Sequence, residues 1–210
     1  MKSLARCKPT YACLSLFAVA CLLPSPAAGT SLYQVGDVVV GESYNDFWKQ
    51  WMKRSFSILV GVEELVFEAD TGLGEAHVSP QHTPEENVER LERMLVIAKE
   101  WSRIAKHNHA DTSKALGCFS NHDDDICEKY GGPNHQNQMG LRFLSGNEGQ
   151  QASLIIELID RGNQFKHETI YFDSHQISAL LKNLKQMPAA MKKAKQASAK
   201  QDLFTIPSKP

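Results

Sequence analysis

Two histidines and one aspartate occupy alternate positions near the middle of the chain, as His107, His109 and Asp111. Zinc and similar borderline metal ions accept imidazole nitrogens and carboxylates as ligands, and a bound ion of this kind can activate water for hydrolysis. The spacing therefore predicts a candidate zinc site and a metal-dependent hydrolase. The alternative is that these residues are the solvated polar end of a helix.

A second group of candidate ligands follows, with His122, Asp123 and Asp125 within the run His-Asp-Asp-Asp. Calcium prefers carboxylate oxygens, so this group predicts a candidate calcium site. The alternating acids and the central glycine of an EF-hand loop do not occur here, and three consecutive acids cannot all face one ion. A solvated acidic loop is the alternative.

The cysteines separate into two groups along the chain. Cys7, Cys13 and Cys21 lie in an N-terminal segment that we expect to be removed, which leaves Cys118 and Cys127. One pair of cysteines in an exported protein predicts a disulfide, which would close a short polar loop and contribute about 2–3 kcal/mol. Paired thiolate metal ligands are the alternative, although zinc-binding cysteines usually stand closer together.

The N-terminal segment has the three parts of a secretory signal peptide. Three basic residues occur among the first eight, residues 11–23 carry no charge, and residues 27–29 are Ala, Ala and Gly. We therefore predict a cleaved signal over residues 1–29 and export to the periplasm or the extracellular space. The apolar run is too short for a typical transmembrane helix, so we do not expect an integral membrane protein after cleavage. A lipoprotein anchored at Cys21 is a minor alternative.

Charge is distributed unevenly along the remaining chain. Removing three basic residues with the signal leaves 20 basic and 24 acidic residues, a net charge of −4, and seven lysines lie in residues 182–210. Residues 189–210 form a basic tail, in which Lys192, Lys193 and Lys195 are candidate contacts for an acidic partner or an anionic surface. A solvated terminal helix is the alternative. Lysines without arginines or aromatic residues do not predict specific nucleic-acid recognition.

No recognisable catalytic motif occurs in the chain. The nucleophile motif G-x-S-x-G is absent, neither remaining cysteine stands in an activating motif, and we assign no catalytic residue. The composition of 42% hydrophobic and 22% charged residues excludes a collagen, a coiled-coil rod and a disulfide-dense miniprotein.

The first half of the mature chain predicts strands and one short helix. Residues 38–40 predict a strand, and residues 56–69 predict two strands or one kinked strand. Between them, residues 43–54 predict an amphipathic helix that begins at Ser43 and buries its aromatic side chains in the core. An aromatic ligand site is the alternative for these side chains.

The residues from Thr83 onward predict a long helix over residues 84–106. Thr83 is a capping residue, Pro84 occupies the first helical position, and Glu86 completes a capping box. Residues 107–138 then predict a long polar loop with one helical turn near residues 112–116.

The C-terminal half predicts three antiparallel strands followed by a helix capped by Asp173 and ended by Pro188. Pairing in this sheet would place Glu157 opposite His167 and Ser153 opposite Tyr171. We interpret Glu157, His167 and Tyr171 as a candidate partner-binding face, although polar alternation also occurs on any half-exposed sheet.

The expected fold class is α+β. An antiparallel sheet, consisting of a C-terminal three-stranded meander and N-terminal strands, packs against two or three amphipathic helices in one domain over residues 30–188. Two functions from different classes follow. The first is a non-catalytic exported protein that binds a protein of the cell envelope, as an assembly factor or an inhibitor or immunity protein does. The second is the metal-dependent hydrolase.

Overall fold

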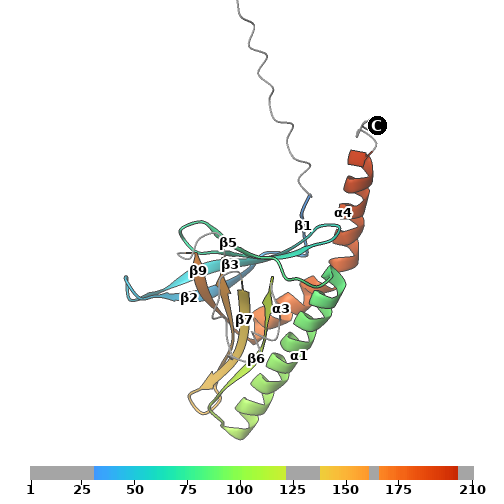
Figure 1. Ribbon diagram of the computed structural model, residues 1–210. Coiled ribbons are helices and arrows are strands. Elements are labelled where there is room, and N and C mark those ends of the chain that lie inside the picture. The colour runs from blue at the N-terminus through green and yellow to red at the C-terminus, as the bar shows by residue number, and fades with distance from the viewer. Residues whose placement is uncertain (1–30, 122–137, 161–165, 203–210) are drawn as a thin grey trace, which may run out of the picture.

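The computed structural model describes residues 31–121, 138–160 and 166–202, so the predicted signal over residues 1–29 lies outside the described residues. The elements, shown in Figure 1, are the strands β1 (Tyr33–Gln34), β2 (Val39–Asn45), β3 (Gln50–Val60), β4 (Leu65–Asp70), β5 (Glu75–Val78), β6 (Thr112–Ser120), β7 (Gln138–Gly146), β8 (Gln151–Ile159) and β9 (His167–Phe172), and the helices α1 (Pro84–Asn108), α3 (Ser174–Leu184) and α4 (Met187–Asp202).

All strand pairs described are antiparallel, and the sheet order is β5-β4-β3-β2-β9-β8-β7-β6, with β1 beside β3. The sheet is curled, because β5 at one end of this order contacts the end of β8. The backbone N–H of His77 donates to Asp160 Oδ2 at 3.3 Å, and Lys166 Nζ donates to the carbonyl of Glu75 at 2.8 Å. Helices α1 and α3 contact each other and several strands, so the α+β class is confirmed.

The core lies between the sheet and these helices and is rich in phenylalanine. Phe56 stacks on Phe67 with ring centroids 6.3 Å apart, and it meets the edge of Phe172 at 5.9 Å. Phe67 also contacts Phe119 at 5.0 Å. These rings are almost fully buried, and burial of such large apolar side chains is the main stabilising contribution in a domain of this size.

Helix α1 begins where the sequence predicts. The hydroxyl of Thr83 accepts a hydrogen bond from the backbone N–H of Glu86, and the Glu86 carboxylate accepts one from the backbone N–H of Thr83. The Thr83 hydroxyl also donates to Glu86 Oε2 at 2.8 Å, and this bond, together with the one from the Thr83 backbone N–H, holds the pKa of Glu86 below its usual value. The helix continues two residues beyond the predicted end and closes on His109, whose left-handed backbone is typical of a C-terminal cap.

The helix predicted over residues 43–54 is wrong. Strands β2 and β3 form an antiparallel hairpin there, with Tyr44 opposite Trp51 and Asn45 opposite Gln50. The aromatic spacing fits a helix, but strand pairing satisfies the backbone of both segments and brings the aromatic rings together on one face. The interpretation of residues 56–69 as two strands is confirmed, because β3 ends at Val60 and β4 begins at Leu65.

The predicted helical turn at residues 112–116 is also wrong, because these residues belong to β6, which pairs with β7. The register shifts between Ala115 and Gly117, where the strand forms a bulge. Gly117 has a positive φ of 149°, and a Cβ there would lie 2.4 Å from the Met94 side chain on α1. A Cβ at this position would displace the end of the Met94 side chain, and the positive φ favours glycine.

The C-terminal strands pair in a register two residues away from the predicted one. Ile159 lies opposite His167, so Glu157 faces Thr169 and Ile155 faces Tyr171. The alternation of polar and apolar residues does not distinguish two registers that differ by two residues, because both place the same side chains on the same face.

The capping box of Asp173 and Gln176 at the start of α3 is confirmed. Helix α4 then begins at Met187, so Pro188 stands in its first turn, where a proline is tolerated, rather than ending the helical region. Ala190, Met191 and Ala194 are buried, so the packed body continues past residue 188. Residues 203–210 lie outside the described residues.

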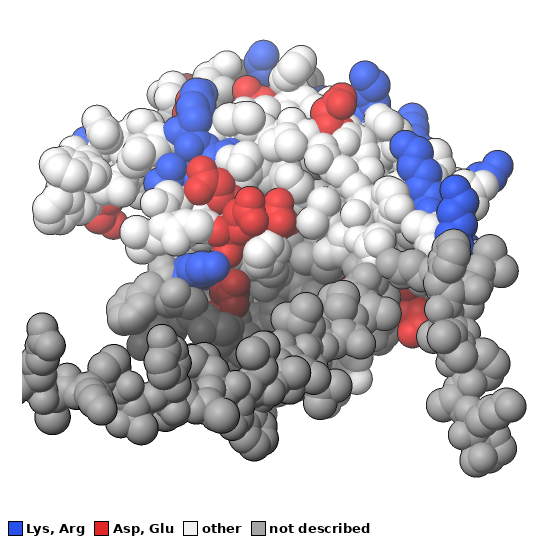
Figure 2. All heavy atoms as spheres, turned by 90° about the horizontal axis from the view of Figure 1, so that it is seen from above, with Lys and Arg blue, Asp and Glu red and all other residues white. Residues whose placement is uncertain are grey.

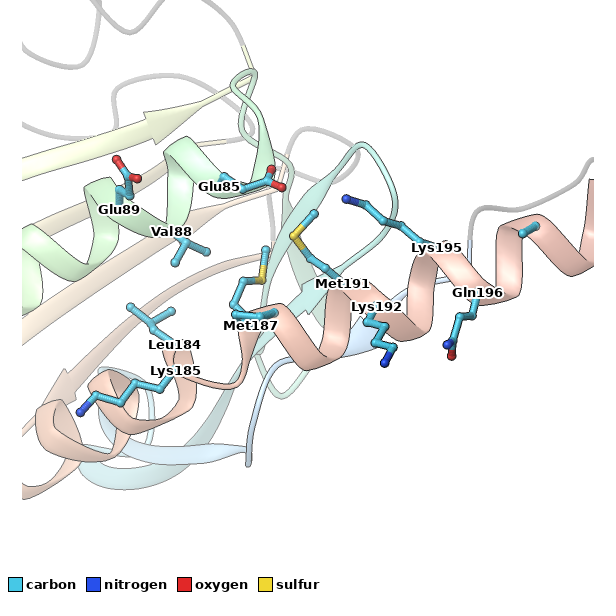
Figure 3. Close-up of a pocket in the computed structure, with 12 residues that line it drawn as sticks. Glu85, Val88, Glu89, Leu184, Lys185, Met187, Met191, Lys192, Lys195 and Gln196 are labelled. Atoms are coloured by element: carbon cyan, nitrogen blue, oxygen red, sulfur yellow. The ribbon is translucent and has the colours of Figure 1, made fainter.

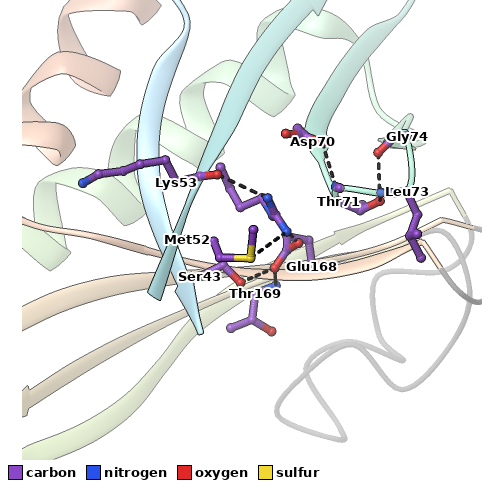
Figure 4. Close-up of polar contacts among 11 residues, drawn as sticks. Ser43, Met52, Lys53, Asp70, Thr71, Leu73, Gly74, Glu168 and Thr169 are labelled. Carbon is purple, nitrogen blue, oxygen red and sulfur yellow. Dashed lines mark hydrogen bonds and ion pairs between the residues drawn. The ribbon is translucent and has the colours of Figure 1, made fainter. Parts of the chain in front are cut away.

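A buried ion pair between Arg54 on β3 and Glu168 on β9 lies beside the phenylalanine core. Arg54 Nε donates to Glu168 Oε2 at 2.9 Å, and both side chains are only 10% exposed. Ser43 Oγ donates to the other carboxylate oxygen, and Figure 4 shows Ser43, Met52 and Glu168 together in this network. The carboxylate thus has a partner for each oxygen, which a buried charge requires.

Candidate interaction surface

The loop that joins β2 to β3 is shaped by one asparagine. The side-chain carbonyl of Asn45 accepts hydrogen bonds from the backbone N–H of Phe47 at 3.1 Å and of Trp48 at 2.9 Å. Lys49 adopts a positive φ of 52°, which turns the chain back into β3. This local geometry directs Phe47 and Trp48 away from the body of the protein.

Five aromatic residues gather at this end of the hairpin, and we call them the aromatic hairpin surface: Tyr44, Phe47, Trp48, Trp51 and Tyr171. Phe47 and Trp48 meet edge to face at 4.7 Å, and Trp51 contacts Tyr44 at 5.4 Å and Tyr171 at 5.2 Å. Phe47 is 81% exposed and Trp48 is 66% exposed. Large aromatic side chains with this exposure are typical of binding surfaces.

The charges beside this surface are of both signs and paired with each other. Lys53 Nζ lies 2.6 Å from Glu42 Oε1, and Lys49 Nζ lies 3.4 Å from Asp46 Oδ1. Figure 2 shows the projecting end of the molecule at the left as a mainly white surface with few charged atoms. An aromatic centre with a polar margin is the usual organisation of a protein–protein interface.

Four of these residues are not among the predicted contacts, because the helix expected over residues 43–54 buries its aromatic side chains in the core, with an aromatic ligand site as the alternative. The signal that could have found them is the Asn45-Asp46 pair, a turn sequence between two segments with alternating polarity. Tyr171 was predicted as a contact, and its ring belongs to the surface through Trp51.

Glu157 and His167, the other two candidates for partner binding on the sheet face, contact each other although they are not directly opposite in the observed register. His167 Nε2 lies 2.9 Å from Glu157 Oε1, a diagonal contact between β9 and β8. The hydrogen bond to Glu157 raises the pKa of His167 above its ordinary value of 6.5. Their role in partner binding stays a prediction.

The three candidate lysines all lie on α4. Lys192 and Lys195 line a groove between α4 and α1, whereas Lys193 is exposed outside it. Figure 2 shows basic side chains gathered at the right, on the side where α4 lies. The expected contact with an anionic surface or an acidic partner stays a prediction.

The first predicted metal site is spread over a helix end and a loop. His107 lies in the last turn of α1, His109 is its cap, and Asp111 accepts a hydrogen bond from the backbone N–H of Gly149 at 3.1 Å. These three side chains do not form a group with ligand atoms all within 4.8 Å of one another. The three candidates His122, Asp123 and Asp125 lie outside the described residues.

Among the described ranges, one group of three donor side chains has such a geometry: Glu68, Glu75 and His77 on the β4–β5 hairpin. His77 Nε2 lies 2.9 Å from Glu68 Oε2 and 3.8 Å from Glu75 Oε2. Two carboxylates and one imidazole could hold a divalent ion, but they are also an exposed ion-pair cluster whose members are partners for one another.

The predicted disulfide involves one described residue. Cys118 is buried on β6, and Cys127 lies outside the described residues, so the bond stays a prediction.

Comparison of the chain with known protein families, with curated proteins and with solved structures finds no match in any of the three. Within the described ranges, no helix has the length and apolar character needed to span a membrane.

Proposed function

We propose that this chain is an exported, non-catalytic protein that binds a partner protein of the cell envelope through the aromatic hairpin surface. The observation that carries the proposal is the exposure of Phe47 and Trp48 at the end of a hairpin, held there by hydrogen bonds to Asn45. Exposed apolar area of this kind costs solubility, and its usual role is to be covered by a partner. Tyrosine and tryptophan are also the side chains most enriched among residues that dominate binding energy.

A protein partner is favoured over a lipid surface by the charges around the aromatic rings. Glu42 pairs with Lys53 and Asp46 pairs with Lys49, so the margin has no net positive charge to attract anionic lipids. The contacts of Trp51 with Tyr44 and Tyr171 order these rings in a fixed arrangement before binding. An ordered surface loses less conformational entropy when it meets a partner.

The proposal is tested by crosslinking in intact cells. The full chain is produced in its native cells with a photoreactive benzophenone amino acid at position 47, and in parallel at position 73. Leu73 is the matched control, because it is 75% exposed in the β4–β5 turn. We expect a discrete crosslinked protein from position 47 and not from position 73. Crosslinks to lipid alone, or the same products from both positions, would overturn the proposal.

A further inference from the structure

A groove of about 850 Å³ lies between the first turns of α1, the end of α3 and the side of α4. Its floor is apolar and consists of Val88, Leu184, Met187 and Met191. Figure 3 shows Val88 pointing from α1 toward Leu184 and Met187, so the floor joins α1 to the consecutive helices α3 and α4, which lie about a hundred residues further along the chain. Methionine side chains adapt their shape to an apolar partner more easily than branched side chains do.

The two walls of the groove carry opposite charges. Glu85 and Glu89 lie on the α1 side, and Lys192 and Lys195 lie on the α4 side. Within the residues that the structure describes, none of these four side chains has an ion pair or hydrogen bond. Each wall can therefore form ion pairs with a ligand without breaking a contact within the protein.

We propose that this groove binds an amphipathic α-helix of a partner protein, independently of the aromatic hairpin surface. The apolar stripe of the helix covers Val88, Met187 and Met191, its acidic flank faces Lys192 and Lys195, and its basic flank faces Glu85 and Glu89. Binding of a helix in an apolar groove is a common mode of peptide recognition.

The charges distinguish this ligand from two others. An acyl chain with an anionic headgroup would use the lysines but would leave two glutamates unpaired along its length. A second copy of α4 is a poor ligand, because residues 195–200 are Lys, Gln, Ala, Ser, Ala and Lys and provide no large apolar stripe. A helix with flanks of opposite charge satisfies both walls.

The test uses the full chain and a labelled synthetic peptide of roughly four helical turns, with a leucine stripe, glutamates on one flank and lysines on the other. A peptide of the same composition in shuffled order is the first control, and binding is measured by fluorescence anisotropy. We expect saturable binding of the amphipathic peptide alone. Absence of binding at about 1 mM peptide, or equal binding of both peptides, overturns the proposal.

Two double variants of α4 locate the binding. K192E/K195E should weaken binding of the amphipathic peptide about tenfold, because repulsion replaces two ion pairs. K193E/K200E changes the charge of the same helix equally at exposed positions outside the groove, and it should change binding less than about twofold. An equal loss in both variants would show nonspecific charge attraction. Saturable binding of a fluorescent fatty acid, with no binding of the peptide, would show a lipid site, and either result overturns the proposal.

Discussion

Strand β3 contains aromatic residues in two very different environments. Trp51 stands near its start and is 56% exposed, whereas Phe56, five residues later, is 1% exposed and packs against Phe67 and Phe172. The buried pair of Arg54 and Glu168 lies between them. Residue type alone does not define the core here. Trp51 and Phe56 are an odd number of positions apart, so they lie on opposite faces of the strand, and the face of Phe56 packs into the core.

The largest effect expected from this comparison is on stability. Phe67→Ala removes a ring that contacts two other phenylalanines and should lower the free energy of unfolding by about 3–5 kcal/mol. Trp48→Ala removes a larger ring from the exposed hairpin end and should change it by less than about 0.5 kcal/mol. Urea unfolding followed by circular dichroism measures both. Similar losses in the two variants would show that the hairpin end belongs to the folding core.

The ion pair at the boundary gives the next expected effect. Glu168→Ala leaves the Arg54 guanidinium buried without its carboxylate and should cost about 3 kcal/mol. Glu42→Ala breaks an exposed ion pair with Lys53 on the hairpin and should cost less than about 1 kcal/mol. Equal losses of unfolding free energy in Glu168→Ala and Glu42→Ala would contradict the difference in burial between the two ion pairs.

The smallest effect concerns the polar sheet face next to Tyr171. Glu157→Gln replaces the carboxylate that raises the pKa of His167 with a neutral amide, so this pKa should fall toward 6.5, as an NMR titration would measure. A raised pKa in the folded state stabilises the protein fully below the unfolded pKa, and this contribution is lost as the pH rises through the folded pKa. An unchanged titration midpoint would contradict the contact.

Local signals in the sequence predict some elements and not others. Helix α1 is predictable because Thr83, Pro84 and Glu86 define its start within four residues. The β2–β3 hairpin is not, because the spacing of Phe47, Trp48 and Trp51 fits a helix, and only pairing between strands decides against it.

The candidate surfaces depend even more on distant contacts. The groove requires Val88 and Met191 to meet across about a hundred residues of sequence, and no local pattern indicates that. The side chain of Tyr171 joins the aromatic hairpin surface only because β9 pairs with β2. The aromatic residues of this surface can be recognised as exposed only after the pairing of β2 with β3 and β9 is known.

The most direct measurement of the central claim uses the protein partner captured at position 47. Its affinity is compared for the unmodified chain, for F47S/W48S and for the control L73S, together with the free energy of unfolding of each chain. We predict a loss of affinity of about 100-fold or more for F47S/W48S alone, with the free energy of unfolding changed by less than about 0.5 kcal/mol. Unchanged affinity, or a loss of about 2 kcal/mol in stability that accompanies weaker binding, would contradict it.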